Sequence, residues 1–195
     1  VHALSQGIRK IAIAIGGSAT NDGGMGMLAA LGVRFLDESG SLLRGCGGDL
    51  EKVASIDLSG LHPAVRETEF TVMCDVTNPL LGPEGATFTF SAQKGADAVM
   101  QQCLEAGMAH YAELAEKATG VPAREVPGAG AAGGLGFALM SFLGANLQSG
   151  IETVLDLVHF DELLKEADLV VTGEGRMDWQ SSYGKVPSGV GKRCQ

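Results

Sequence analysis

The amino-acid sequence predicts an α/β fold, a mostly parallel sheet flanked by helices with a β-hairpin excursion. The first observation is a set of three short apolar runs, at residues 11–15, 70–74 and 167–171. Strands that are apolar on both faces belong to a buried, mostly parallel sheet covered by helices. The second observation is that segments with helical spacing separate these runs, most clearly at residues 97–118. Strands that alternate with helices in this way indicate the α/β class.

Each helix is predicted from the spacing of its apolar residues. Within residues 97–118, apolar side chains recur at intervals of three and four, and His110 falls on the polar side, where we expect it to be solvated. Gly32 is predicted to stop a short helix over residues 24–31. The remaining helices are expected at residues 133–147, 151–157 and 160–165.

The hairpin is predicted between the first two long apolar runs. Residues 33–36 and 42–43 are mostly apolar, and they flank the polar sequence Asp37-Glu38-Ser39-Gly40. Apolar segments separated by Asp, Ser and Gly residues are typical of β-hairpins.

Composition narrows the classes of function. A chain of 195 residues fits one domain, so we expect a single α/β domain over residues 1–195. The sequence has 23 acidic and 14 basic residues, which gives a formal net charge of −9 and argues against a nucleic-acid partner. No apolar run approaches the roughly 18–20 residues that a membrane helix needs, so no membrane partner is expected.

Cysteines and histidines are scattered rather than grouped. The sequence contains no Cys-x-x-Cys pair, and its four histidines do not combine with cysteines in a zinc-site spacing. A reduced, cytoplasmic protein fits best, with the thiols as small core residues. These thiols belong to Cys46, Cys74, Cys103 and Cys194.

Polar, glycine-bearing loops follow all three predicted strands, at residues 16–24, 75–79 and 173–178. In parallel α/β sheets, ligands bind beyond the carboxyl ends of the strands. We therefore expect the acidic residues of these loops to gather around one crevice. Alternatively, they make only turns and helix caps. The four residues in question are Asp22, Asp75, Glu174 and Asp178.

The first of these loops suits an anion. Its small residues let successive backbone N–H groups point inward, and the following helix adds its positive end. Ser18 and Thr20 can donate hydroxyl hydrogen bonds, and Asn21 offers an amide. The loop is not a Walker P-loop, because no Gly-Lys-Ser/Thr follows at the required spacing.

A second glycine string, at residues 128–133, fits Gly-x-Gly-x-x-Gly. Residues 123–127 before it make a poor strand, so close helix contact or a phosphate explains the string as well as a dinucleotide does. Lys94 stands just before a predicted helix and can offer a positive charge to a phosphate. An exposed lysine without a ligand is the alternative there.

Several long strings, in order, resemble the bacterial glycerate kinases of the type I family. Residues 15–24 match the family's first signature, Ile-Gly-Gly-Ser-Ala-Thr-Asn-Asp-Gly-Gly. The resemblance covers nearly the whole chain, with two departures. Ser91 and Ala92 stand where the family usually has Gly-Pro before Gln-Lys-Gly, and the last fifteen residues follow the family pattern loosely. The other matching strings are residues 74–82, 93–96, 127–136 and 172–176.

The resemblance implies an enzyme of two α/β domains, one inserted in the other. This chain is similar mostly to the inserted domain, and both flanking parts of the other domain are absent. We therefore expect a fragment, which could lack activity by itself. A surface meant for absent segments could also drive self-association into a homodimer.

The activity that the resemblance implies is transfer of the ATP γ-phosphoryl group to a hydroxyl of D-glycerate, giving phosphoglycerate. Phosphoryl transfer needs positioning, charge neutralisation and a metal ion, so ATP and Mg²⁺ are the expected cofactors. Asp75 is expected to orient or deprotonate the attacking hydroxyl, while Lys94 and Arg176 balance negative charge. Metal binding is assigned to Asp22, Glu174 and Asp178. Substrate or phosphate binding is assigned to Gly16, Gly17, Ser18, Thr20, Asn21, Asn78 and Gly175.

Two other classes stay open at this point. One is a dinucleotide-dependent oxidoreductase, which would use the second glycine string and Glu152, some 20 residues later. The other is a non-catalytic domain kept for assembly or for ligand binding.

Overall fold

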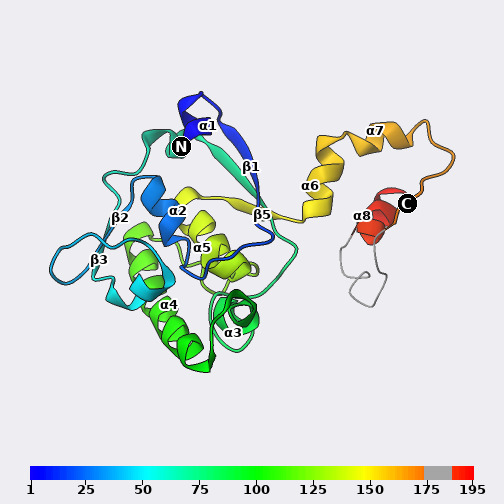
Figure 1. Ribbon diagram of the computed structural model, residues 1–195. Coiled ribbons are helices and arrows are strands. Elements are labelled where there is room, and N and C mark those ends of the chain that lie inside the picture. The colour runs from blue at the N-terminus through cyan, green and yellow to red at the C-terminus, as the bar shows by residue number, and fades with distance from the viewer. Residues whose placement is uncertain (174–185) are drawn as a thin grey trace. The chain divides into compact units, whose positions relative to one another are not determined.

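The computed structural model describes residues 1–173 and 186–195 (Figure 1). The chain divides into two compact units, Val1–Leu147 and Gln148–Gln195, and each unit is described by itself. Of the predicted site residues, four lie outside the described residues: Glu174, Gly175, Arg176 and Asp178.

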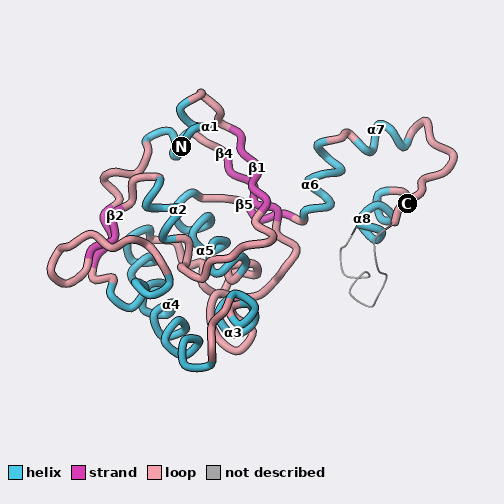
Figure 2. Tube along the Cα trace, in the orientation of Figure 1, coloured by secondary structure: helices cyan, strands magenta, loops and turns pink. Residues whose placement is uncertain are grey.

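A small sheet organises the first unit. Strand β1 (Lys10–Ala14) pairs in parallel with β4 (Glu69–Met73), from Lys10 opposite Glu69 to Ala14 opposite Met73. Strand β5 (Asn146–Gln148) lies on the other side of β4, so the order is β1-β4-β5 (Figure 2). The first two predicted strands and their parallel pairing are thus confirmed, each displaced by one residue.

The third predicted strand is wrong. Residues 167–171 form no strand, and Leu169 and Val171 are 80% and 86% exposed. The third strand of the sheet is instead β5, which overlaps the end of the helix predicted over residues 133–147. An apolar run becomes a strand when a neighbouring strand satisfies its backbone groups. The described part of the second unit offers residues 167–171 no such neighbour.

The predicted hairpin strand at residues 33–36 pairs mainly with a later segment, not with residues 42–43. Strand β2 (Arg34–Leu36) pairs with β3 (Ser55–Asp57), while Leu42 makes a single bridge to Leu36. The predicted turn is confirmed, because Asp37 Oδ1 accepts hydrogen bonds from the N–H groups of Ser39 and Ser41, both at 2.9 Å.

The helices of the first unit follow the predicted order. The longest, α4 (Ala98–Thr119), begins where Asp97 Oδ1 accepts from the Met100 N–H at 2.8 Å, and ends at Gly120, whose φ is +74°. On its exposed side His110 is also held, because its Nε2 lies 2.7 Å from the Val53 carbonyl oxygen. The other helices are α1 (His2–Ser5), α2 (Met25–Ala30), α3 (Ala86–Phe90), α5 (Ala131–Leu143) and the 3₁₀ helices η1 (Gly47–Lys52), η2 (Pro63–Glu67) and η3 (Ala92–Lys94).

Helix α5 contains a reversal near its start. Ala132, Gly133 and Gly134 have φ values of +55°, +70° and +91°, so regular helix begins only after them. The carbonyl of Gly133 accepts a hydrogen bond from the Gly23 N–H at 3.0 Å. This bond ties the start of α5 to the loop that follows β1.

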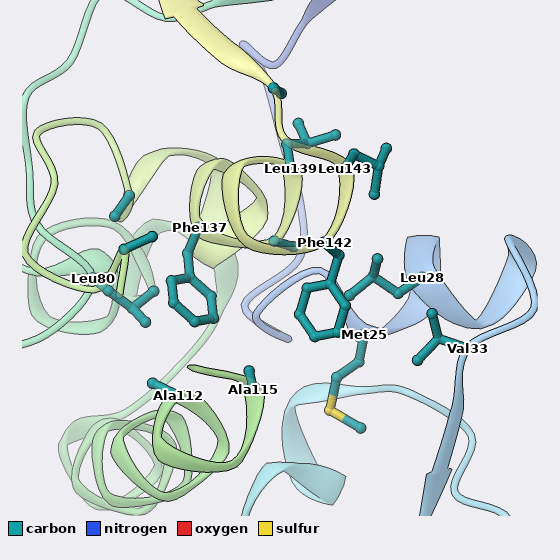
Figure 3. Packing of buried hydrophobic residues seen from close by; sticks show 14 of the residues in the cluster. Met25, Leu28, Val33, Leu80, Ala112, Ala115, Phe137, Leu139, Phe142 and Leu143 are labelled. Atoms are coloured by element: carbon teal, nitrogen blue, oxygen red, sulfur yellow. The ribbon is translucent and has the colours of Figure 1, made fainter. Parts of the chain in front are cut away.

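The core of the first unit lies between α2, α4 and α5. Figure 3 shows Phe142 of α5 facing Met25 and Leu28 of α2, while Phe137 of α5 lies beside Leu80. The Tyr111 ring makes edge contacts with two phenylalanine rings, at centroid distances of 6.0 and 6.1 Å. Burial of these side chains holds the loops around β1 and β4 in place.

The described residues of the second unit form three helices: α6 (Gly150–Leu157), α7 (Phe160–Leu164) and α8 (Val186–Arg193). Arg193 joins them, because its guanidinium pairs with Glu152 and Asp156 of α6 and with Asp161 of α7. Across the described residues of both units, no helix combines the length and apolar character needed to cross a bilayer.

Candidate functional site

The loops after β1 and β4 leave the sheet at the same edge, because Ala14 and Met73 are paired at the carboxyl ends of their strands. This is the arrangement predicted for two of the three loops. Because residues 167–171 are no strand, the argument that a third strand brings its loop to this edge is wrong.

The loop after β1 presents a row of backbone donors. The backbone turns at Gly16-Gly17, and within the described part of the chain the N–H groups of Gly16, Gly17, Ala19 and Thr20 donate no hydrogen bond. Gly17 has a φ of +70°, which favours glycine. A Cβ on Gly16 would meet nothing within 4 Å, so neither backbone conformation nor crowding requires glycine there. Open N–H groups beside an unobstructed glycine suit the close approach of an anion.

Lys94 reaches this loop from the end of η3. Its Nζ donates to Ser18 Oγ at 2.9 Å and to the Thr20 carbonyl oxygen at 2.7 Å. Partial burial lowers the pKa of Lys94, and the nearby Asp22 carboxylate opposes that shift. Lys94 is therefore not fully exposed, as the alternative had it: it is a partly buried cation whose hydrogen bonds fix the loop, and whether it binds a ligand stays a prediction.

Two cavities open on either side of Lys94. The glycine-loop cavity, of about 300 Å³, contains Asp75, whose side chain is exposed. Its lining is Ile15, Gly16, Gly17, Ser18, Met73, Cys74, Asp75, Val76, Phe90, Gln93, Lys94, Ala131 and Ala132.

The Asp22 cavity, of about 350 Å³, lies on the other side. Lys94 is the one basic residue that lines either cavity in the described part of the chain. The lining of the Asp22 cavity is Ala19, Thr20, Asn21, Asp22, Gly45, Cys46, Gly47, Ser91, Lys94, Ala96 and Leu104.

Asp22 performs the structural role that the sequence left open. Its Oδ1 accepts from the Gly24 N–H at 2.9 Å, and its Oδ2 accepts from the Gly26 N–H at 3.2 Å, so the carboxylate caps the first turn of α2. Asp22 also lines the Asp22 cavity, although only 8% of its surface is exposed.

Two amides predicted to bind substrate have partners in the protein. Asn21 Nδ2 donates to Thr87 Oγ1 at 3.3 Å, and Asn21 still lines the Asp22 cavity. Asn78 Nδ2 donates to the Glu84 carbonyl oxygen at 2.7 Å, and Asn78 lines neither cavity. The structure therefore brings together Gly16, Gly17, Ser18, Thr20, Asn21, Asp22, Asp75 and Lys94.

The second glycine string serves close backbone contact. A Cβ on Gly130 would lie 2.1 Å from the Pro79 carbonyl oxygen, and one on Gly133 would lie 2.0 Å from the Thr20 carbonyl oxygen. No strand precedes the string, whereas a dinucleotide-binding loop follows one. The oxidoreductase reading is not favoured.

Sequence reasoning missed several residues that line the cavities. Ala132 stands in a left-handed conformation at the glycine-loop cavity, and Gln93 lies beside it. The segment Gly45-Cys46-Gly47 lines the Asp22 cavity. The signal that could have found this segment is its own glycine cluster, at residues 45–48.

Metal binding has a limited basis in the described residues. No group of three or more His, Cys, Asp or Glu side chains there could hold a metal ion. Mg²⁺ commonly keeps several waters and takes one or two carboxylates together with substrate phosphates. Each Asp22 oxygen retains a lone pair beside its N–H bond, so a contact through water fits that chemistry.

The comparisons with known proteins agree with one another. The model of the "Glycerate kinase family" matches residues 1–195. The chain is 53% identical to the glycerate kinase of Bacillus subtilis (strain 168) over 193 residues, which cover 99% of this chain and 50% of that protein. It is 50% identical to the glycerate 2-kinase of Escherichia coli (strain K12) over 190 residues, which cover 97% of this chain and 50% of that protein.

A solved structure extends the similarity to the fold. A crystal structure assigned to glycerate kinase 2 of Salmonella typhimurium LT2 superposes with a TM-score of 0.91 at 49% identity, over 99% of this chain and 52% of that one. The chain spans about half the length of the curated relatives it matches. With motifs, fold and family model in agreement, this chain belongs to the glycerate kinase family.

Proposed function

We propose that this chain carries the anion-binding part of a glycerate kinase, which transfers the γ-phosphoryl group of ATP to a hydroxyl of D-glycerate. One observation carries the proposal: the open N–H groups of Gly16, Gly17, Ala19 and Thr20 belong to a loop that Lys94 binds, at the carboxyl ends of two parallel strands. Backbone donors and one fixed cation are what phosphates and carboxylates require. The family membership supports the choice of substrates.

Asp75 is the proposed base. It lines the glycine-loop cavity together with Lys94, so an acceptor hydroxyl bound there lies near both a carboxylate and a cation. During transfer, the bond between the γ-phosphorus and the ADP oxygen breaks as the hydroxyl oxygen bonds to phosphorus. The hydroxyl proton passes to the Asp75 carboxylate. Lys94 offsets the negative charge on the phosphoryl oxygens.

The remaining roles rest on the family resemblance. Mg²⁺ would neutralise phosphate charge, with Asp22 reaching it through water and Glu174 and Asp178 as further oxygen ligands. Arg176 would share the charge-balancing role of Lys94, and Gly175 would contact substrate. Asn78, which lines neither cavity and donates to Glu84, would support the loop after β4 instead.

Phosphorus NMR tests the proposed activity. The chain is mixed with ATP, Mg²⁺ and D-glycerate, and the expected products are ADP and phosphoglycerate. Asp75→Asn should lower kcat more than tenfold, because an amide cannot accept the proton. Glu38→Gln, an exposed change in the hairpin turn, is the matched control and should leave kcat unchanged. Near-normal turnover in Asp75→Asn would remove the role of this carboxylate.

Binding without turnover would identify a different function. If ATP and D-glycerate both raise Tm but no phosphoglycerate forms, the chain supplies a binding part and requires the rest of the family's length for catalysis.

We also propose a cytoplasmic location, where ATP is available, and a homodimer. The exposed Leu169 and Val171 side chains support self-association, and light scattering measures it directly.

A further inference from the structure

A third cavity lies where the first half of α4 meets η1, two segments that lie side by side (Figure 1). This Met100 cavity has a volume of about 270 Å³ and is lined by Gly47, Gly48, Glu51, Met100, Cys103 and Leu104. Met100 is 54% exposed, although methionine is usually buried. Neither the resemblance nor the proposed catalytic roles use this apolar side of α4.

The Met100 cavity adjoins the Asp22 cavity. Gly47 and Leu104 line both, so a ligand that lies across these two residues contacts both cavities. A Cβ on Gly47 would lie 2.9 Å from Leu104 Cδ2 and 2.8 Å from the Asn21 carbonyl oxygen. Glycine at position 47 therefore keeps the boundary between the cavities thin.

The two cavities differ in charge and polarity. The Asp22 cavity holds the Lys94 ammonium and the Asp22 carboxylate, whose two oxygens accept backbone N–H bonds. Among the described residues, the Met100 cavity has no cation in its lining; it holds the Glu51 carboxylate and the exposed apolar side chain of Met100. A ligand with an anionic end and a flat, uncharged ring gains most with its anionic end at Lys94 and its ring against Met100. An amino group on the ring could donate a hydrogen bond to Glu51.

We propose that the Met100 cavity binds the base of the phosphoryl-donor nucleotide, whose phosphates extend through the Asp22 cavity to Lys94. This inference rests on the proposed function, since it presumes that the chain binds ATP. It assigns the donor to one side of Lys94 and leaves the glycine-loop cavity, with Asp75, to the hydroxy acid. The Met100 cavity and the Asp22 cavity together have the size that small-molecule sites commonly have, roughly 300–1,000 Å³.

The natural cysteines allow a site-resolved test. Cys46 lines the Asp22 cavity, Cys103 lines the Met100 cavity, and Cys194 lies in the second unit as a reference; all three are exposed free thiols. Alkylation by iodoacetamide is followed for each cysteine by peptide mass spectrometry, with ATP or with inorganic tripolyphosphate present. Tripolyphosphate carries the phosphates without the base.

The expected result is that ATP slows alkylation of both Cys46 and Cys103 several-fold, whereas tripolyphosphate slows alkylation of Cys46 alone. If both ligands protect Cys46 and ATP leaves Cys103 unprotected, the phosphate site stands and the base site is wrong. If tripolyphosphate protects Cys103 to the same degree as ATP, the protection does not come from the base, and the base site is again rejected. If neither ligand changes any rate, the proposed function fails together with this inference.

Two neighbouring residues of α4 supply matched variants. Met100→Gln places an amide in the cavity, whereas Val99→Gln makes a similar change at a 72% exposed position that lines none of the three cavities. Met100→Gln should weaken ATP binding about tenfold and leave tripolyphosphate binding unchanged. Val99→Gln should change neither affinity. Equal ATP affinity for Met100→Gln and the unaltered chain would overturn the proposal.

Discussion

Lys94 Nζ donates a hydrogen bond to Ser18 Oγ at 2.9 Å, across 76 residues of sequence. The same ammonium donates to the Thr20 carbonyl oxygen at 2.7 Å. These bonds join the loop after β1 to the end of η3, and they place one cation between the glycine-loop cavity and the Asp22 cavity. Both cavities therefore depend on the same side chain.

Replacing Lys94 with methionine should weaken ATP binding by about tenfold to a hundredfold, because a charge-assisted hydrogen bond contributes roughly 1.5–3 kcal/mol. Isothermal titration calorimetry measures the affinity. Lys117→Met removes an exposed lysine of α4 and is the control for net charge. The same affinity in both variants would show that Lys94 does not contact the phosphates.

Alanine should affect different properties at Gly16 and Gly133: ligand binding at the first and stability at the second. At Gly133, φ is +70° and a Cβ would lie 2.0 Å from the Thr20 carbonyl oxygen, so Gly133→Ala should destabilise the fold by more than about 2 kcal/mol. At Gly16 the Cβ meets open space, so Gly16→Ala should leave Tm nearly unchanged while it weakens binding of D-glycerate, the ligand assigned to the glycine-loop cavity. Thermal unfolding and calorimetry on both variants check this. A large loss of stability in Gly16→Ala would contradict the assignment of this glycine to ligand approach.

The sequence was sufficient to predict β1, β4 and the loop after each, because their apolar runs stop at glycine or aspartate. The sequence could not show that β5, and not residues 167–171, supplies the third strand of the sheet. The stronger apolar run is the one without a neighbouring strand, whereas Asn146–Gln148 is polar at both ends and still pairs with the sheet. Strand formation depends on neighbours that a single segment does not reveal.

The residues of the candidate site also include some that the sequence predicted and some that it did not. Loop position predicted Asp75 at a crevice, and the family resemblance added Lys94 as a charge-balancing residue; both line the glycine-loop cavity. The cap formed by Asp22 is the alternative role that the sequence left open, whereas the contact of Asn78 with Glu84 is a local bond that a functional reading of amides overlooks. Met100 gave no signal, because in sequence it is one apolar residue of an amphipathic helix.

Tyr111→Phe should stabilise the protein. The Tyr111 hydroxyl is buried and has no hydrogen-bond partner among the described residues. Burial raises the pKa of this hydroxyl far above its usual value, and the Asp22 carboxylate adds to the shift. Removing an unsatisfied buried group recovers part of a cost of about 1–3 kcal/mol, so the urea midpoint should rise. Thr68→Val is the contrast: the buried Thr68 hydroxyl donates to the Ala64 carbonyl oxygen, so its loss should lower the midpoint.

Glu116 fixes the segment that supports the loop after β4. Its Oε1 accepts from the N–H groups of Ala123 and Arg124, and its Oε2 pairs with the Arg124 guanidinium. The Arg124 carbonyl oxygen in turn accepts from the Leu80 N–H at 2.9 Å. Burial acts to raise the pKa of Glu116, but the hydrogen bonds from Arg124 and its positive charge outweigh burial and lower it below the ordinary 4.5.

A carboxyl whose pKa is lower in the folded state contributes stability above its unfolded pKa, and this contribution disappears as the pH falls through the folded pKa. Glu116→Gln should therefore lower the free energy of unfolding by about 1–2 kcal/mol at pH 7, since the Arg124 pair is partly screened by solvent. The difference from the unaltered chain should shrink below pH 4.5 and vanish under more acidic conditions. Urea unfolding from pH 7 to pH 3 measures this, with Glu113→Gln, an exposed change on the same helix, as the control. A difference that persists unchanged to pH 3 would mean that Glu116 acts through its shape rather than its charge.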